Sequence, residues 1–460
     1  MSVTMPPAAA AGHSWLSHFR ETFALGIPLI GAQLAQQGIN ATDIFILGQL
    51  SAVDLAATVL ATQYFFTIFI FGAGLAIAVI PMVAQAYSQG DEVAVRRAMR
   101  MGMWASILFG LIMLPLFIWS HPILLAMGQE ADVALKASHY LHIVGFAMFP
   151  ALLFHVLRSL VSATGRASVV LWATVAMLVV NAVLAYALVL GHFGFPQFGI
   201  RGAAVAAFLV QLFGFLFLAV YIERDPELRR YELFVRFWKP DWQAFREVVM
   251  LGLPIGVAVL AEVSMFTVSS VLMGQFGAVP LAAHGIAIQL SSITFMVPLG
   301  LSQAGTVRVG LFHGAGDRAN VMRASVTVMV VAIGFAVASG IAFALAPRAL
   351  SSLFIDISLP DAAAVIAYAA PLIIIAALFQ LLDTAQAIMN GLLRGLKDAR
   401  IPMVLVLIAY WIIGLPLAWL LAFPFGLGGI GIWTGFLCGL GTAAVMLSIR
   451  YWRLLQRAEG

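Results

Sequence analysis

The sequence predicts an all-α integral membrane protein with twelve transmembrane helices. Its 460 residues are 63% apolar and only 10% charged, with a mean hydropathy of +1.03, whereas soluble proteins are about a quarter charged. The apolar runs are continuous and do not alternate with polar residues, which excludes a membrane β-barrel. Because one helix needs roughly 20 apolar residues to cross the bilayer, the chain has room for about a dozen spans.

Apolar runs between clusters of charged and turn-forming residues define the spans in order. The first six are expected near residues 24–47, 57–86, 102–126, 138–161, 168–190 and 202–222, and the second six begin near residues 248, 281, 324, 362, 402 and 430. The implied loops place 21 of the 24 Lys and Arg residues on one side, and only Lys136, Arg201 and Arg348 on the other. Since cytoplasmic loops collect positive charge, both termini are predicted to be cytoplasmic.

The chain is predicted to consist of two related halves. Residues 223–247 form the longest polar stretch, with six basic and six acidic side chains, and this linker separates an amino-terminal six-helix lobe (1–222) from a carboxy-terminal one (248–460). With an offset of 226, residues 25–91 align with residues 251–317 without a gap, and 22 of the 67 positions are identical. Six spans separate the copies, so both insert in the same sense, as in some secondary transporters.

Three acidic residues lie inside predicted spans. Asp43, Glu262 and Asp383 fall within the first, seventh and tenth spans, and no Lys or Arg is expected beside them at depth. An ionised side chain at the bilayer centre costs roughly 2.5–3.5 kcal/mol on insertion scales. These carboxylates must therefore face water, bind a mobile cation or carry protons, which is the chemistry of ion coupling. The alternative is a structural role, in which protonated carboxyls donate hydrogen bonds between helices.

Further polar residues extend two of these positions into stripes along one helix face. By helical spacing, Gln36 and Asn40 align with Asp43. On the tenth span, the residues aligned with Asp383 are Gln380, Gln386 and Asn390. In the frame of the repeat, Glu262 corresponds to Gln36 and Ser269 corresponds to Asp43, so the two lobes are chemically unequal. The equivalent pair Gln63 and Gln289 either lines the same wet surface or forms hydrogen bonds between helices.

Two prolines are candidates for hinges. Pro28 and Pro254 occupy equivalent positions near the start of the first and seventh spans. A proline inside a helix removes one backbone hydrogen bond and kinks the helix. Transporters can use such kinks as bending points, although a kink without motion is the alternative interpretation.

Composition and motifs exclude several other functions. The net charge of +4 comes from basic residues at helix ends, where anionic headgroups account for them, so no binding of nucleic acid is expected. Cys438 is the single cysteine, which excludes an internal disulfide, and it is expected to pack in the core. The start of the chain does not have the pattern of a removable signal peptide. We find no hydrolase motif and no phosphate-binding loop, so the protein is not expected to be an enzyme.

Several motifs together are specific to one family. They are LGIP at the start of the first span with Asp43 and Gly48 after it, DLAATVLA and VPLAAHGIA in equivalent positions of the two halves, NAVLAYALVLG in the fifth span, and GLLRGLKDARIP at the end of the tenth. With these motifs the sequence resembles the multidrug and toxic compound extrusion (MATE) family of antiporters, and within it the NorM-like branch. The resemblance covers nearly the whole chain.

The resemblance implies two lobes around a central cavity and roles for individual residues. In NorM-like members, acids at the positions of Asp43, Glu262 and Asp383 serve ion coupling and cation binding, and a Na⁺ site at Glu262 and Asp383 is one form of this role. The fifth span carries Asn181 and no acid, which departs from the branch that uses an aspartate pair in the amino-terminal lobe. Phe379, one turn before Asp383, offers a ring face to a cation, without the hydroxyl that a tyrosine gives some relatives.

The function implied is secondary active multidrug efflux by alternating access. Small lipophilic organic cations leave while Na⁺, H⁺ or both enter, because the two kinds of cation compete for one anionic cluster. The expected partners are organic cations, a monovalent cation and membrane lipids, with no cofactor, and a monomer in the bacterial inner membrane is expected. A lipid-linked glycan flippase of the same superfamily is the main alternative, but its pyrophosphate favours Arg or Lys in the cavity. An integral membrane enzyme is a further alternative.

Overall fold

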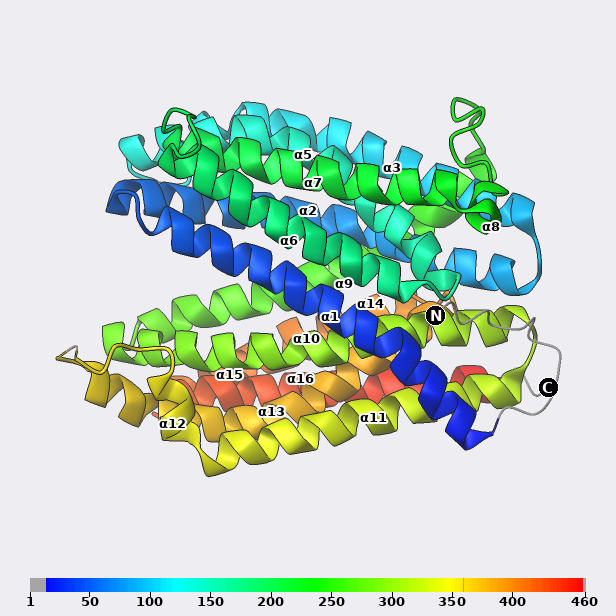
Figure 1. Ribbon diagram of the computed structural model, residues 1–460. Helices are drawn as coiled ribbons and strands as arrows, with labels where there is room; N and C mark the ends of the chain where they lie inside the picture. Colours follow the sequence, from blue (N-terminus) through cyan, green and yellow to red (C-terminus); the bar gives the residue numbers. More distant parts are fainter. Residues whose placement is uncertain (1–13, 359, 458–460) are drawn as a thin grey trace. The chain divides into compact units, whose positions relative to one another are not determined.

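Helices are the regular elements of the computed structural model, which describes residues 14–358 and 360–457 (Figure 1). The long helices of the first half are α1 (Trp15–Leu47), α2 (Ala52–Ser88), α3 (Glu92–Ile118), α5 (Ala131–Ala163), α6 (Ala167–Leu190) and α7 (Gly199–Arg224). Those of the second half are α9 (Trp242–Gly274), α10 (Ala278–Gly314), α11 (Arg318–Leu345), α13 (Ala362–Gly395) and α16 (Gly428–Arg457). Between α13 and α16 runs one interrupted helix, made of α14 (Arg400–Leu407), the π-helical turn η1 (Ile408–Gly414) and α15 (Leu415–Ala422). Short connecting helices are α4 (Ser120–Ala126), α8 (Pro226–Arg229) and α12 (Pro347–Ser352).

Eleven helices of the described chain are long and apolar enough to cross a membrane. They are α2, α3, α5, α6, α7, α9, α10, α11, α13, α16 and the interrupted helix over residues 400–422. Helix α1 has 33 residues but is not among them. The reason is visible in its sequence, where Gln36, Asn40, Asp43 and further glutamines lower the hydropathy of an otherwise apolar segment.

The helices extend beyond the predicted spans. The apolar runs predict starts near residues 102 and 324, whereas α3 and α11 begin ten and six residues earlier. Equivalent turns start both helices: Gly90 and Gly316 have φ angles of +70° and +74°, which suit glycine. Asp91 and Asp317 then cap the helices by accepting a backbone N–H three residues ahead, at 2.8 and 3.1 Å. Hydropathy marks only the part of a helix inside lipid, so it misses these charged first turns.

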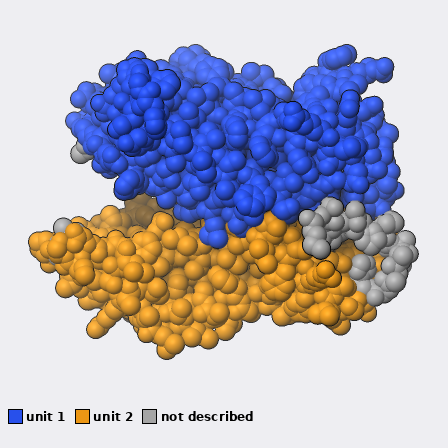
Figure 2. Space-filling view, viewed as in Figure 1, with its two compact units in different colours: residues 1–10, 31–256 blue, residues 11–30, 257–460 orange. Residues whose placement is uncertain are grey.

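The chain divides into two compact units, which Figure 2 shows in blue and orange. One unit contains residues 31–256, and the other contains α1 up to Ile30 together with the chain from Val257 onward. The two breaks, after residues 30 and 256, are separated by the repeat offset of 226. The first part of α1 therefore belongs to the second unit, and the first part of α9 belongs to the first unit. The lobe limits 1–222, 223–247 and 248–460 stay a prediction.

Close glycine contacts hold each exchanged segment in its unit. A Cβ added to Gly74 of α2 would lie 2.3 Å from the backbone nitrogen of Gly256, and a Cβ added to Gly300 of α10 would lie 2.7 Å from that of Ile30. Both members of one pair are 226 residues from their counterparts in the other. In a membrane, helices associate by such close approach of small residues. The internal repeat thus encodes the same helix contact twice.

A buried arginine also anchors the first part of α1 in the second unit. The Arg308 side chain of α10 is 1% exposed. It donates hydrogen bonds to the His18 carbonyl (3.0 Å), the Thr22 hydroxyl (2.5 Å) and the Glu21 carboxylate (2.9 Å). One His18 ring nitrogen lies 2.7 Å from the guanidinium, and the other lies 2.9 Å from Oδ1 of Asn320 on α11. The start of α1 is therefore joined to two helices of this unit.

The polar linker between α7 and α9 is fixed along the side of α3. Arg100 donates hydrogen bonds to the backbone carbonyls of Leu233 (3.0 Å) and Glu232 (2.7 Å). One turn further along α3, the Trp104 indole donates to the carbonyl of Phe237 (2.9 Å). The linker is thus part of the first unit and lies against it in a defined path.

We expect the substitution Arg100→Leu to release this linker. The variant removes charge-assisted hydrogen bonds of about 1.5–3 kcal/mol each and leaves the linker carbonyls to water. Chymotrypsin should cleave the linker several-fold faster in the purified variant than in the unchanged protein, because its aromatic side chains become accessible. The matched control is Arg318→Leu, which alters an exposed arginine at the start of α11. Equal cleavage rates in both variants would show that the contacts of Arg100 do not fix the linker.

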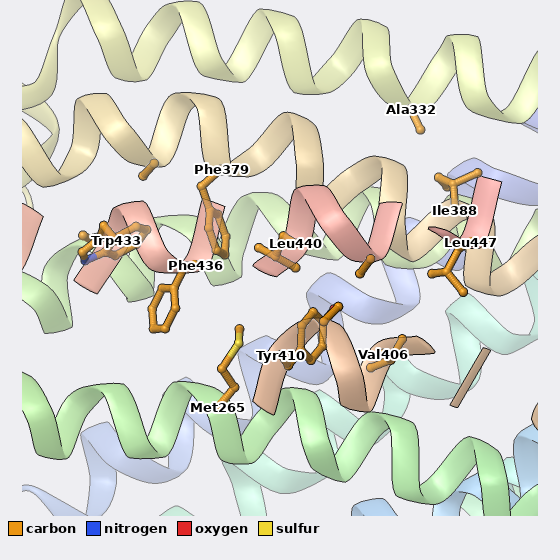
Figure 3. Packing of buried hydrophobic residues seen from close by; sticks show 14 of the residues in the cluster. Met265, Ala332, Phe379, Ile388, Val406, Tyr410, Trp433, Phe436, Leu440 and Leu447 are labelled. Atoms are coloured by element: carbon orange, nitrogen blue, oxygen red, sulfur yellow. The ribbon is translucent and has the colours of Figure 1, made fainter. Parts of the chain in front are cut away.

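Helix α13 has the largest set of neighbours in the second unit, since it packs against α10, α11 and α16 (Figure 1). Its Phe379 belongs to an apolar cluster with Trp433 and Phe436 of α16 and Tyr410 of η1 (Figure 3). The cluster forms the packed interior of the second unit. The expected core position of Cys438 is wrong, because the cysteine lies on the exposed side of α16.

Candidate functional site

In the first unit, the acidic residue of α1 has a polar partner on α6. The Asn181 amide donates a hydrogen bond of 2.7 Å to Oδ1 of Asp43. Asn181 is 1% exposed and Asp43 is half-buried. The charge of Asp43 also acts on the buried Tyr140 of α5, whose hydroxyl interacts with Thr62 of α2. Four helices therefore contribute polar groups here, and the sequence had indicated only Asp43 and Asn181 without pairing them.

In the second unit, two acidic residues of different helices act on each other. Glu262 of α9 and Asp383 of α13 are close enough for their charges to repel. Asp383 is 6% exposed and Glu262 is half-buried. Gln386 lies beside Glu262, and the phenol of Tyr410 lies within electrostatic range of both carboxylates. The structure thus brings Glu262 and Asp383 together, as the sequence could not show.

Polar atoms in this cluster lack hydrogen-bond partners. Oδ1 of Asp383, both amide atoms of Gln386 and the hydroxyl of Tyr410 are buried, and none has a hydrogen bond of ordinary geometry within the described chain. Although Gln386 is next to Glu262, its amide is not well aligned with that carboxylate. Buried polar groups in native proteins are nearly always paired with protein, water or an ion. These four atoms therefore mark a place where water or a cation is to be expected.

One expectation about the surroundings of the acids requires correction. Arg394 was expected in a cytoplasmic loop, but α13 continues to Gly395 and the arginine is half-buried, with its charge acting on Glu262. A basic residue is therefore present near one of the three acids. In the described chain no Lys or Arg lies within 4.0 Å of a carboxylate oxygen of Asp43, Glu262 or Asp383, so none of them is locked in an ion pair.

Other predicted site residues of the second unit make internal contacts. The Gln380 amide donates to the Thr294 hydroxyl (2.5 Å) and accepts from Ser339 (2.8 Å). Ser269 is buried and donates to a backbone carbonyl of its own helix. Asn390 is also buried. The two hydrogen bonds of Gln380 join α13 to α10 and α11.

The ring of Phe379 is packed among other aromatic side chains. It is 1% exposed and lies edge-on to Trp433, with 5.3 Å between centroids, and to Phe266, with 6.1 Å. Because the side chain is almost fully buried, its ring is not open to a cation in this structure, and the role predicted for Phe379 stays a prediction.

The remaining predicted lining residues are more accessible. Asn40, Gln63 and Gln289 are exposed and Gln36 is half-buried. The two glutamines at equivalent positions of the repeat thus have the same exposure class, which favours a wet surface over a buried hydrogen bond between helices. The described residues contain no group of three or more His, Cys, Asp and Glu side chains that could hold a metal ion. The donors present are two carboxylates with neutral oxygens, which are the ligand types that hard cations prefer.

Long apolar helices, a duplicated half and acidic residues at depth without ion pairs are together typical of a membrane transporter. The chain belongs to the MatE family, which it matches over residues 28–187 and 254–420. It is 56% identical over 456 residues to a probable multidrug resistance protein NorM of Agrobacterium fabrum, covering 99% of this chain and 98% of that protein. A protein of the same description from Rhizobium meliloti is 56% identical over 451 residues and covers 98% of this chain and 97% of its own.

Solved structures confirm the predicted fold class. The eukaryotic MATE transporter AtDTX14 superposes with a TM-score of 0.85 at 22% identity and covers 96% of this chain and 98% of its own. A MATE protein in complex with MaL6 gives a TM-score of 0.87 at 19% identity, covering 96% and 97%. The family resemblance and the twelve-helix fold predicted from the sequence are therefore both confirmed.

Two residues near the acids were not predicted from the sequence. Tyr410 lies in the apolar segment IAYWIIG, where no neighbouring polar residue marks it as part of a site. Arg394 was assigned to a loop because charged residues usually end a span. The signal available for Arg394 was the apolar run on its amino-terminal side, which continues as one helix to Gly395.

Proposed function

We propose that this chain is a secondary active efflux antiporter, which exports lipophilic organic cations in exchange for inward Na⁺, H⁺ or both. Its relatives from Agrobacterium fabrum and Rhizobium meliloti bear the description of probable multidrug resistance proteins, which supports organic compounds as substrates. The observation that carries the proposal is the buried pair of Glu262 and Asp383, whose charges repel and whose neighbourhood contains unpaired polar atoms. A site of this kind binds cations in preference to anions, which disfavours a lipid-linked pyrophosphate.

Competition for negative charge would couple the two transported species. A drug cation and an inorganic cation that share one anionic cluster each weaken the binding of the other, typically by about 1–3 kcal/mol. Glu262 and Asp383 are proposed as the coupling pair, and Asp43 with Asn181 as the cation-binding group of the first unit. An inward-moving monovalent cation gains about 2.3 kcal/mol per 100 mV of membrane potential. That energy would drive the outward step of the drug.

Alternating access would use bends in α1 and α9. Pro28 and Pro254 each lie two residues before the point at which the chain passes from one compact unit to the other. A helix that lacks one backbone hydrogen bond at this point bends at lower cost than an intact one. We therefore propose both prolines as hinges.

The other predicted lining residues are proposed to contact the substrate. They are Gln36, Asn40, Gln63, Ser269, Gln289, Phe379, Gln380, Gln386 and Asn390. The proposed location is the bacterial inner membrane, as a multi-pass monomer surrounded by lipid with both termini in the cytoplasm. The strong excess of Lys and Arg in one set of loops supports this orientation.

An efflux assay in proteoliposomes tests the function. Vesicles containing the purified protein are loaded with ethidium, and its exit is followed by fluorescence under an imposed Na⁺ gradient, an imposed pH gradient or no gradient. We expect exit to accelerate with at least one inward cation gradient, and the active gradient identifies the coupling ion. Equal exit under all three conditions, at the rate of protein-free vesicles, would refute the antiporter.

A further inference from the structure

Unpaired buried polar atoms are concentrated beside the two carboxylates of the second unit. In the described chain, nine buried side-chain nitrogen and oxygen atoms lack a hydrogen-bond partner, and four of them belong to Asp383, Gln386 and Tyr410. These side chains are 6%, 1% and 0% exposed. Asp383 and Gln386 belong to α13, whereas Tyr410 belongs to η1. Their proximity is therefore a property of the fold and not of one helix. A cluster of this kind is the expected appearance of an ion site whose ligand atoms are in place.

The Tyr410 hydroxyl is placed by an unusual backbone feature. It belongs to the π-helical turn Ile408–Gly414, which interrupts an otherwise α-helical segment. Such turns are rare and are frequent at functional sites. The turn is fixed by direct backbone packing, because a Cβ added to Gly439 of α16 would lie 3.0 Å from the Cα atom of Gly414. The position of Tyr410 is therefore determined by the backbone as well as by side-chain packing.

A second buried tyrosine shows what an ordinary structural hydroxyl looks like in this unit. Tyr451 of α16 is 2% exposed, and its hydroxyl shares a hydrogen bond with Ser325 of α11. Tyr410 is equally buried, but its hydroxyl has no such partner and lies within electrostatic range of Glu262 and Asp383. The Tyr410 hydroxyl therefore makes no hydrogen bond that would explain its burial, and its oxygen offers a neutral lone pair to a cation.

We propose that the oxygen atoms of Tyr410 and Gln386 complete the cation site of Glu262 and Asp383 as neutral ligands to a dehydrated monovalent metal cation. This inference rests on the proposed antiport function and adds a residue that determines ion specificity. A bare proton needs only one carboxylate oxygen, whereas a metal cation that leaves water needs several oxygens to replace its hydration shell. Carboxylates and amide or hydroxyl oxygens are the donors that hard cations prefer. Tyr410 therefore favours Na⁺ over H⁺ at this site.

The substitution Tyr410→Phe tests the inference, because it removes only the hydroxyl. Thermal unfolding of the purified protein is measured by tryptophan fluorescence while Na⁺ replaces choline at constant ionic strength. We expect the variant to unfold in choline at the same or a higher temperature than the unchanged protein, since an unpaired buried hydroxyl is removed. The Na⁺ concentration for half-maximal stabilisation should rise at least about fivefold, within the usual range of coupled binding. Tyr451→Phe should instead unfold at a lower temperature and retain the Na⁺ response.

A second variant keeps the inference testable if Tyr410→Phe is poorly produced. Gln386→Met has nearly the same volume and removes both amide atoms, so it should also weaken the response to Na⁺. In efflux assays, both variants should lose activity driven by a Na⁺ gradient more than activity driven by a pH gradient.

The outcomes separate this inference from the proposed function. An unaltered Na⁺ titration in both variants, or an unchanged protein that transports with a pH gradient but is not stabilised by Na⁺, would overturn the neutral-ligand role and leave the antiporter in place. Absence of transport under either gradient would overturn both.

Discussion

Replacing Asp383 with asparagine is expected to abolish gradient-driven efflux while the protein still folds. The amide has nearly the shape of the carboxylate, so the packing of α13 against α10, α11 and α16 is retained. The substitution removes one of two negative charges that repel each other. The electrostatic attraction of the site for a cation is thereby reduced. The coupling between inorganic cation and drug, about 5- to 150-fold in affinity for typical linked ligands, should disappear.

Efflux and binding should be measured together on this variant. Ethidium affinity is titrated with and without Na⁺, and at two pH values, in the unchanged protein and in Asp383→Asn. In the unchanged protein the coupling ion should weaken ethidium binding, whereas in the variant it should have no effect. The control is Asp356→Asn, which alters an exposed loop carboxylate bonded only to Ser358. Full gradient-driven efflux in Asp383→Asn would show that this carboxyl serves helix packing alone.

Replacing Arg308 with methionine should destabilise the second unit more than any surface substitution. The guanidinium is buried and is hydrogen-bonded to His18, Thr22 and Glu21 of α1. Removing one partner of a buried charged network typically costs about 3–5 kcal/mol. Because these bonds attach the first part of α1 to this unit, we expect a much lower apparent melting temperature and increased proteolysis near the start of α1.

Two further variants show whether the hydrogen-bonding geometry of Arg308 or its positive charge stabilises the second unit. Arg308→Lys keeps the positive charge but cannot bond to three acceptors in a planar fork, so its melting temperature should be intermediate. Arg318→Met changes an exposed arginine of α11 and should leave the melting temperature within experimental error. If Arg308→Met were as stable as Arg318→Met, the anchor of α1 would have to be the contact between Ile30 and Gly300.

The residues of the candidate site could be proposed from the sequence, because charged residues are rare in segments that cross lipid. Asp43, Glu262 and Asp383 stand out in the sequence, since an acidic residue in a long apolar run has few structural explanations. The internal repeat was equally visible in the sequence, and the structure shows equivalent turns at its matched positions Gly90 and Gly316. Family motifs added the fold, which the comparisons confirm.

The contribution of individual neighbours was harder to predict. Tyr410 is one of several aromatic residues in apolar spans, and its backbone position depends on a π-helical turn fixed against Gly439 of another helix. Arg394 was misplaced because a charged residue was assumed to end its span, whereas α13 continues past it. The burial of Phe379 among Trp433 and Phe266 likewise depends on three separate helices.

The sequence by itself determined that the chain is a membrane protein of duplicated origin with three acids at depth, because hydropathy and repetition are properties of the chain alone. Only the tertiary structure decided that Asp43 is bonded to Asn181, that Glu262 lies within electrostatic range of Asp383, and that the first parts of α1 and α9 belong to different units from the rest of these helices. The physical reason is that these pairings depend on the rotation and depth of helices that are more than a hundred residues apart. The rotation and depth of these helices are set by close packing at glycines and by one interrupted helix. Neither feature leaves a periodic signal in the sequence.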